Sequence, residues 1–419
     1  MSVREVRASI GQRLLWQMDH HRGANGALNC PIFLRLRGPA HVGELEAAID
    51  RLGRRHESLR TTFAGRGPRL TQLIHDVPER MPIAEVDLSG EDDVAEALER
   101  AMAAEARTPV DPCEWPLRAT LWRLSDDEHV LCLNMHHLVT DGWSCAVLAS
   151  ELGRLYAAPG NGALPEVAWQ YEQWSEWQQR LLEGETLRGL RDYWRRRLAG
   201  ATLPALPRAA VRADPAERTT RVERASLEAP VVARLERLAR EGRTGLFAVV
   251  LAVLYLLLHR ETGQSDVAVG SIFANRSRPE LRHTVGFLSN MVVLRNRLER
   301  PSFADVLRSV SETIVGALAH QDLPYQMLPL DTMDPGSGRP DSVVFQLFAG
   351  PMGRTETARG RIEPVLVVPD GIGSRWDFEL SLLPSADGMT VMLCYAEDLF
   401  EPEWARRFLD GYVSLATSV

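Results

Sequence analysis

The sequence has 419 residues, of which 45% are hydrophobic and 25% are charged, and its net charge is −8. This composition is ordinary for a globular protein, the length suits two domains of about 200 residues each, and the negative charge argues against a nucleic-acid partner. All 48 basic residues are arginines, so the sequence excludes a Schiff-base lysine, a pyridoxal anchor and a P-loop lysine.

The cysteines and the apolar runs indicate a soluble, cytoplasmic protein. The five cysteines are scattered, form no C-x-x-C pair and fit neither a disulfide framework nor a zinc site. The longest apolar run, Leu246–Leu258, has 13 residues, whereas a membrane span needs about 20. This run predicts a buried core helix with Thr244 as its N-cap. The N-terminus lacks the apolar core of a signal peptide, and we expect a monomer that binds no metal and no cofactor of its own.

The first half of the chain predicts a layered α/β arrangement. A helix is expected over 10–18, a strand over 32–36 and an amphipathic helix over 43–56, whose apolar residues form one stripe. The run 130–135 is almost wholly apolar and predicts a buried strand. A helix follows from Gly142.

The second half begins after a segment rich in tryptophan. Trp169, Trp174 and Trp177 are expected in the core rather than on a ligand platform. The pattern then predicts a long helix to Arg197, an Ala/Pro/Arg-rich linker over 199–217, a strand over 221–225, a loop over 335–341 and a final helix over 401–417. The predicted organisation is a first lobe at 1–175, a connecting helix and linker at 176–217, and a second lobe at 218–419.

Two adjacent histidines, His136 and His137, follow the predicted strand 130–135, and Asp141 and Gly142 open the next helix. An imidazole is the side chain best suited to move a proton near neutral pH. Taken alone, His137 would be expected to be a core histidine satisfied by the backbone. Strand alternation turns His136 the other way, and Asp141 is a favoured helix N-cap.

The run His136-His137-x-x-x-Asp141-Gly142 resembles the active-site motif of condensation domains of nonribosomal peptide synthetases. These domains belong to an acyltransferase superfamily similar to chloramphenicol acetyltransferase. Five further stretches resemble other motifs of the family in the same order along the chain: Ser9–Trp16, Arg55–Phe63, Tyr171–Gln178, Ala274–Asn290 and His320–Tyr325. The chain is therefore identified as a member of this family, either as a free-standing enzyme or as an excised domain.

Two departures from the family pattern concern the substrate channel. The seventh motif is present only as Arg339–Gln346, and Met291 follows Asn290 where the family usually has threonine. These differences bear on the substrate and the subtype rather than on the chemistry. The run from Asp141 to Ser144 favours a condensation domain over an epimerisation domain.

The resemblance implies the fold, the reaction and the partners. The expected fold is α/β, a pseudo-dimer of two chloramphenicol-acetyltransferase-like lobes in a V shape with an active-site tunnel between them. The expected reaction moves an acyl group from a carrier-protein phosphopantetheinyl thioester to the amine of an acceptor aminoacyl group, with donor and acceptor carrier proteins as partners. Holding two tethered reactants at attack distance can remove about 7–11 kcal/mol of the barrier.

The resemblance also implies roles for individual residues. His137 is expected to be the general base or to position the nucleophile, and His136 is expected to have an orienting role. Asp141 is expected to form a buried ion pair with Arg276, as an alternative to the plain N-cap, and Gly142 either admits the thioester close to the backbone or is an ordinary turn glycine.

Other residues are expected to have supporting roles. Arg60 is expected to organise the buried structure, and the channel is expected to involve Trp143, Ser144 and Asn290. Cys145 is expected to be a small core residue rather than a nucleophile. His56 and Glu57 are expected to be structural, and the arginines at 195–197 form either a solvated helix face or a contact for a carrier protein.

Two other functions stay open at this point. One is an acyltransferase that forms esters with a hydroxyl acceptor. The other is a non-catalytic condensation-like domain that recruits partner enzymes, against which the retained histidines and Asp141-Gly142 argue.

Overall fold

The computed structural model of the chain describes residues 3–22, 26–76, 81–158, 164–208, 218–298, 302–334, 339–348, 355–357, 360–365, 375–385 and 387–419. It divides into two compact units. Unit 1 comprises Met1–Arg180, Ala274–Ser289 and Gly350–Gly373, and unit 2 comprises Leu181–Phe273, Asn290–Ala349 and Ser374–Val419. The predicted lobes were contiguous, whereas the structure places two later segments of the chain in unit 1.

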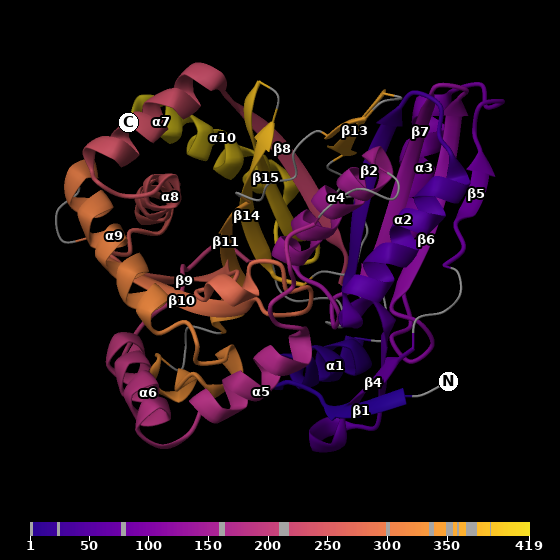
Figure 1. Cartoon of the computed structure of the whole chain (residues 1–419). Coiled ribbons are helices and arrows are strands. Elements are labelled where there is room, and N and C mark those ends of the chain that lie inside the picture. Colours follow the sequence, from indigo (N-terminus) through magenta and orange to yellow (C-terminus); the bar gives the residue numbers. More distant parts are fainter. Residues whose placement is uncertain are drawn as a thin grey trace. The chain divides into compact units, whose positions relative to one another are not determined.

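Unit 1 is built on a mixed β-sheet, labelled in Figure 1. Among the described residues, its strands lie in the order β12 (Thr355–Thr357), β13 (Gly360–Val365), β2 (Asn29–Arg37), β7 (Glu128–His136), β6 (Leu117–Ser125) and β5 (Ala84–Asp87). The predicted strands at 32–36 and 130–135 are β2 and β7, which pair antiparallel with Ile32 opposite Leu133. β13 pairs with the other edge of β2, which explains why a late segment of the chain belongs to unit 1.

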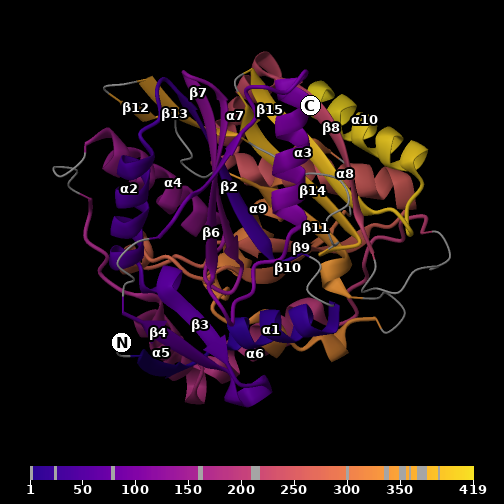
Figure 2. The same cartoon turned by 90° about the vertical axis from the view of Figure 1, so that its right-hand side faces the viewer.

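Helices pack against both faces of this sheet, because the strands carry apolar side chains on both faces. The helices are α2 (Val42–Arg55), α4 (Gly142–Ala157) and α3 (Val94–Arg107). On β2, Ile32 and Leu34 share a core with α2 and α4, whereas Phe33 shares a core with α3. Figure 2 shows α2 and α4 on one side of the strands and α3 on the other. The predicted amphipathic helix is α2, and its apolar stripe is buried at Leu45, Ala48, Ile49 and Leu52.

Unit 1 also contains a small sheet and two further helices. The small sheet has the order β1 (Val3–Arg7), β4 (Thr71–His75) and β3 (Thr61–Ala64) among the described residues. The helices are α1 (Ile10–Arg22), which is the predicted opening helix, and α5 (Tyr171–Leu181). Trp174 of α5 is 2% exposed and lies in a core cluster with Leu281 and Leu288.

Unit 2 contains a second mixed sheet (Figure 1). In the described part of the chain its strands are ordered β10 (Asn290–Arg297), β9 (Asp266–Phe273), β11 (Val343–Leu347), β14 (Phe378–Ser385), β15 (Gly388–Ala396) and β8 (Thr220–Glu228). Its helices are α6 (Gly184–Leu198), α7 (Ala229–Glu241), α8 (Leu246–Thr262), α9 (Phe303–Ala319) and α10 (Pro402–Ser418). The predicted strand at 221–225 and the final helix are β8 and α10. The α/β fold class is confirmed.

The apolar run 246–258 forms α8 and is buried, as predicted. The predicted N-cap is wrong, because the cap is Gly245, which makes no side-chain bond, and the Thr244 hydroxyl instead accepts a hydrogen bond from Ser311 at 3.0 Å. Within the described residues, no single helix has the length and apolarity to cross a membrane, and α7 and α8 meet that test only as a pair bent by 105°.

Two predictions for the middle of the chain need correction. The long helix to Arg197 is interrupted between α5 and α6, where Gly184 has a φ of 58°. A left-handed backbone of this kind favours glycine and ends the helical hydrogen-bond pattern. The described part of the predicted linker, 199–208, also packs onto unit 2, since Ala201 and Leu203 are buried and Thr202 accepts a backbone hydrogen bond from Ala268. Residues 209–217 and 335–338 lie outside the described residues.

Candidate active site

His137 lies in the turn between β7 and α4 and is half-buried. Its backbone N–H donates to the Leu28 carbonyl at 2.8 Å, and its Nδ1 lies 2.7 Å from the Thr140 carbonyl oxygen. Because a carbonyl oxygen can only accept, Nδ1 carries the proton and the lone pair of the neutral ring is on Nε2. The Phe287 ring meets the imidazole edge-on, with centroids 5.1 Å apart. The turn therefore fixes both the tautomer and the orientation of the ring.

His136 ends β7 and is buried, with an exposed fraction of 2%. Its Nδ1 accepts the backbone N–H of Leu138 at 3.1 Å, and its Nε2 lies 3.6 Å from the Asp19 carboxylate. The ring bonds across the turn that carries His137. These contacts are those of a residue that shapes the turn.

The first motif supports the same turn from α1. Ser9 and Gln12 form a capping box, in which the Gln12 N–H donates to the Ser9 hydroxyl and the Ser9 N–H donates to the Gln12 side chain. The Gln12 amide then donates to the Leu138 carbonyl at 3.1 Å. The sequence contained the capping signal Ser-x-x-Gln, but its contact with the histidine turn was not predicted. Gln12 thereby links α1 to the residue that follows His137.

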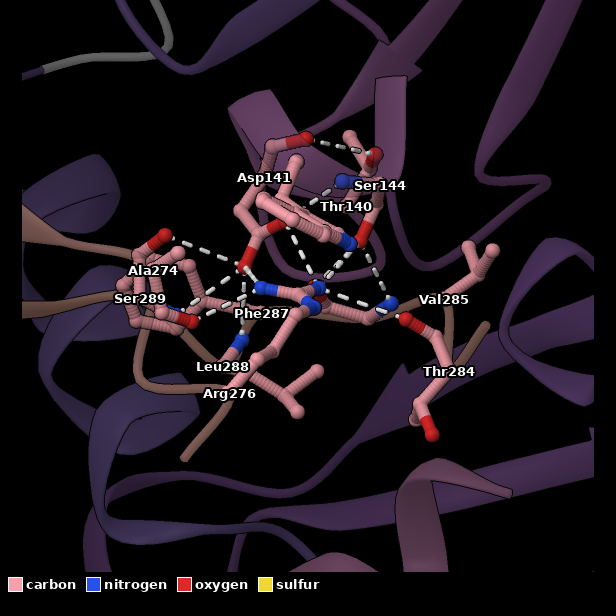
Figure 3. Close-up of polar contacts among 12 residues, drawn as sticks. Thr140, Asp141, Ser144, Ala274, Arg276, Thr284, Val285, Phe287, Leu288 and Ser289 are labelled. Atoms are coloured by element: carbon pink, nitrogen blue, oxygen red, sulfur yellow. Dashed lines mark hydrogen bonds and ion pairs between the residues drawn. The ribbon is translucent and has the colours of Figure 1, made fainter. Parts of the chain in front are cut away.

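Asp141 is both the N-cap of α4 and the partner of Arg276, two roles that the sequence presented as alternatives. Its carboxylate accepts the Ser144 N–H at 2.8 Å and binds two terminal nitrogens of Arg276 at 3.0 Å each (Figure 3). The Oδ2 atom also accepts hydrogen bonds at 3.0 Å from the Leu288 N–H and from the N–H and hydroxyl of Ser289. One carboxylate thus joins the start of α4 to the segment 274–289.

The pair is buried, since the side chains of Asp141 and Arg276 are 0% and 3% exposed. Burial alone would raise the pKa of Asp141, but the charge and hydrogen bonds of Arg276 and the bonds from Ser144 outweigh it and lower the pKa. The carboxylate is therefore ionised, fully bonded and out of reach of a substrate. Its position suits an architectural role.

Ser144 connects the same segment to α4. Its hydroxyl donates to the Gly286 carbonyl at 3.0 Å and accepts from the Gly286 N–H at 3.1 Å and from Arg276 at 2.9 Å. Although Ser144 was expected at the channel, the side chain is 0% exposed and lies within this buried hydrogen-bond network.

Gly286 is held against Tyr171 of α5. It has a φ of 155°, and a Cβ atom there would lie 2.1 Å from the Tyr171 ring. The Tyr171 hydroxyl donates to the Phe287 carbonyl at 3.0 Å and shares a 2.7 Å hydrogen bond with Ser9. The first, fourth and fifth motifs therefore meet around the segment that carries Phe287, the ring beside His137.

The other predicted site residues have the following positions. Gly142 is the exposed first residue of α4, and Trp143 is half-buried with its indole N–H on the Arg282 carbonyl at 3.0 Å. Arg60 donates to the carbonyls of Gly53 and His75, which suits the expected organising role.

Asn290 belongs to unit 2, where its side-chain amide donates to the Gln321 and Leu323 carbonyls at 2.7 Å each and accepts from the Tyr325 N–H at 3.0 Å. It ties the sixth motif to the start of β10. The expected channel residue thus has a structural set of contacts within its own unit.

A second buried charge cluster was not predicted. His56 was considered beside Glu57, but its Nε2 lies 2.7 Å from Glu151 of α4, and Arg55 binds the same carboxylate at 2.9 Å. Burial lowers the pKa of His56. Burial opposes ionisation of Glu151, yet hydrogen bonds from His56 and Arg55 lower its pKa overall. The second motif therefore anchors α2 to α4.

A family model for the condensation domain matches residues 4–418. The chain belongs to the condensation-domain family. The linear gramicidin synthase of Brevibacillus parabrevis, in one of its subunits, is 34% identical over 99% of this chain, and phosphinothricin tripeptide synthetase PhsC of Streptomyces viridochromogenes is 34% identical over 99%. The match covers 6% and 39% of the length of these two relatives. The family predicted from the six motifs is confirmed.

Solved structures show the same fold. The X-domain from teicoplanin biosynthesis matches this condensation domain with a TM-score of 0.79 and 26% identity, covering 99% of this chain and 95% of that chain. The first condensation domain of the calcium-dependent antibiotic synthetase, in complex with a substrate analogue, matches with a TM-score of 0.81 and 21% identity, covering 99% and 96%. The condensation-domain fold expected from the resemblance is confirmed.

Replacing Asp141 by asparagine should destabilise this condensation domain by about 3–5 kcal/mol, because it leaves the buried Arg276 charge uncompensated. The exposed Asp126, whose side chain is 89% exposed and pairs with Arg123, provides the matched control. Asp126→Asn should cost less than about 1 kcal/mol. Urea unfolding at pH 7 measures both, and equal losses would contradict the assigned burial of the Asp141 charge.

The stability difference between wild type and Asp141→Asn should depend on pH. Because folding lowers the pKa of Asp141, the carboxylate contributes its stability above the unfolded-state pKa of about 3.9 and loses it as the pH falls toward the folded-state pKa. The difference in unfolding free energy should be constant from pH 7 to about pH 5 and then shrink by up to about 1.4 kcal/mol per pH unit below the unfolded-state pKa. Unfolding titrations over this range test it, and a difference that grows on acidification would refute the assignment.

Gly286→Ala should destabilise the domain by about 1–3 kcal/mol or more, because the new methyl group would collide with the Tyr171 ring. Gly43→Ala is the control, since Gly43 lies in the first turn of α2 and its Cβ would have no neighbour within 4 Å. We expect the control to change stability by no more than about 0.5 kcal/mol. Thermal and urea unfolding compare the two variants.

Proposed function

We propose that this condensation domain transfers an acyl group from a carrier-protein thioester to the amine of an acceptor aminoacyl group, forming an amide bond. Family membership over residues 4–418 supports acyl transfer. The observation that carries the proposal is the His137 imidazole, whose Nδ1 proton is held by the Thr140 carbonyl so that Nε2 is the basic atom. Donor and acceptor carrier proteins are the proposed partners, and the cytoplasm is the proposed location.

The chemistry needs no covalent enzyme intermediate. The acceptor amine attacks the thioester carbonyl carbon, a C–N bond forms, the C–S bond breaks, and the proton lost by the amine ends on the departing thiol. His137 Nε2 would take up that proton or hold the amine in position for attack, a contribution of about 10²–10⁴ in rate. Asp141 is buried and fully bonded, so it serves to fix the turn and does not relay the proton.

The start of α4 could stabilise the developing oxyanion. Gly142 is the first residue of α4 and is exposed, and backbone N–H groups at a helix N-terminus favour negative charge. The Asp141–Arg276 pair holds this end of α4 in place. We therefore assign the Gly142 N–H as the proposed donor to the thioester oxygen in the transition state.

His137→Ala should lower the rate of condensation by about 10²–10⁴ without unfolding the domain. His137→Asn should lose as much, because asparagine can keep a donor to the Thr140 carbonyl while removing the basic nitrogen. Cys145→Ala is the control; its sulfur lies 3.6 Å from the Thr140 hydroxyl, and its turnover should be nearly intact. Intact-protein mass spectrometry of loaded carrier proteins measures product, and an unchanged rate in His137→Ala would refute the proposal.

Amide formation can be separated from ester formation with matched acceptors. An acceptor amine and its hydroxyl analogue, presented in the same way to the same donor, should differ in turnover in favour of the amine. Preference for the hydroxyl would assign the domain to ester formation while leaving the role of His137 intact.

A second candidate function is the recruitment of a partner enzyme. The X-domain from teicoplanin biosynthesis has also been solved in complex with OxyB, and it is 27% identical to this chain with a TM-score of 0.78. Recruitment without catalysis would show as tight binding of a partner enzyme by wild type and His137→Ala alike, with no turnover by either protein.

A further inference from the structure

Four arginines from two elements line one pocket of unit 2. Arg196 and Arg197 come from the last turn of α6, and Arg295 and Arg297 come from the end of β10. The pocket has a volume of about 140 Å³. A water molecule in the liquid occupies about 30 Å³, so the space suits four or five water-sized groups, the size of one tetrahedral oxyanion.

The charge of this arginine pocket is not balanced by its neighbours. Asp266 binds Arg295 through both carboxylate oxygens at 2.7 Å and Arg297 at 2.9 Å. Burial would raise the pKa of Asp266, but the bonds from these two arginines lower it, so Asp266 carries one negative charge. In the described part of the chain, neither Arg196 nor Arg197 forms an ion pair with a carboxylate. Four positive charges therefore face a single negative one, in a chain whose net charge is −8.

Two of the arginines also have structural work, which separates the wall of the pocket from its binding groups. Arg295 is 6% exposed and spends its N–H groups on Asp266 and on the carbonyls of Arg197, Ala199 and Gly200, which close the end of α6. Arg197 donates to the Arg295 carbonyl and to the Thr313 hydroxyl, both neutral groups. Arg295 therefore contributes charge, and Arg196, Arg197 and Arg297 remain to donate hydrogen bonds.

The α6 dipole alone does not account for this arrangement. Cations are favoured at a helix C-terminus, which explains Arg196 and Arg197. It does not explain the approach of Arg297 from β10, since like charges repel unless an anion lies between them. Guanidinium groups match the geometry of phosphate oxygens and bind them through paired hydrogen bonds.

We propose that the arginine pocket of unit 2 binds a phosphate group, either free inorganic phosphate or the phosphate of a phosphomonoester. Arg196 and Arg297 donate from the rim, Arg197 donates from the wall, and the buried charge of Arg295 strengthens the attraction. The proposal does not depend on acyl transfer, because binding is measured on the full chain without donor or acceptor.

Calorimetric titration of the full chain with inorganic phosphate, at constant ionic strength in chloride, tests the site. Wild type should bind one phosphate saturably. The double variant Arg196→Gln/Arg297→Gln should bind at least about tenfold more weakly, equivalent to about 1.4 kcal/mol. Arg195→Gln is the matched control on the same helix, because Arg195 is exposed, pairs with Asp192 and does not line the pocket; its affinity should change less than about twofold.

A second pair of probes separates the two sources of the phosphate. Phosphopantetheine and pantetheine differ only in the phosphate, so phosphopantetheine should bind and pantetheine should not. Tighter binding of phosphopantetheine than of inorganic phosphate would identify an esterified ligand, and the reverse order would identify the free anion.

Folding of each variant is checked by circular dichroism and thermal unfolding. Arg196→Gln alone loses no ion pair of the described residues, so it keeps the test valid if the double variant does not fold. Absence of saturable phosphate binding to wild type, or equal weakening by Arg195→Gln and the pocket variants, would overturn the proposal.

Discussion

The buried contact between Asp141 and Arg276 is the interaction on which the candidate active site depends. Two residues separated by 135 positions form a doubly bonded ion pair whose side chains are 0% and 3% exposed. Such a pair has a high desolvation cost and is favourable only where further hydrogen bonds satisfy it. Here, Ser144, Leu288 and Ser289 supply those bonds. The pair thereby sets the position of α4 against the segment that carries Phe287.

The histidine turn is supported from three directions that use different physical means. Backbone bonds to Leu28 and Thr140 fix the His137 ring, the capping-box residue Gln12 holds the next carbonyl, and Phe287 packs against the imidazole. Tyr171 connects the last two, because its hydroxyl bonds both Ser9 and the Phe287 carbonyl. A general base is effective only when held at a defined distance from its proton, and this arrangement provides a rigid support for one.

Local periodicity predicted the elements well where one strong pattern decided them. The apolar stripe of α2 and the wholly apolar β7 were found because burial on one or both faces leaves a clear period in the sequence. The break between α5 and α6 was missed, although the isolated Gly184 was its signal. The Thr244 cap was missed because a hydroxyl before an apolar run can bond elsewhere, here to Ser311.

Long-range relations could be predicted only from the family resemblance or not at all. Arg276 was paired with Asp141 because both stand in recognised motifs, whereas the bond from Gln12 to Leu138 and the ion pair of His56 with Glu151 have no local signature. Periodicity reports which face of an element is buried but does not report which distant residue covers it. Ser144 and Asn290 show the same limit, since their motif positions were recognised while their buried hydrogen bonds were not.

The exchange of strands along the chain has a consequence for biosynthesis. Unit 1 takes β13 and the segment 274–289 from far downstream, so a ribosome that has released only the first 180 residues has exposed Asp141 without its guanidinium partner and β2 without its edge neighbour. Chains fold from the N-terminus as they emerge, yet this unit must wait for roughly half of the second one to be translated. Truncated forms ending before residue 276 would therefore be expected to occupy chaperones and proteases rather than accumulate as a native half.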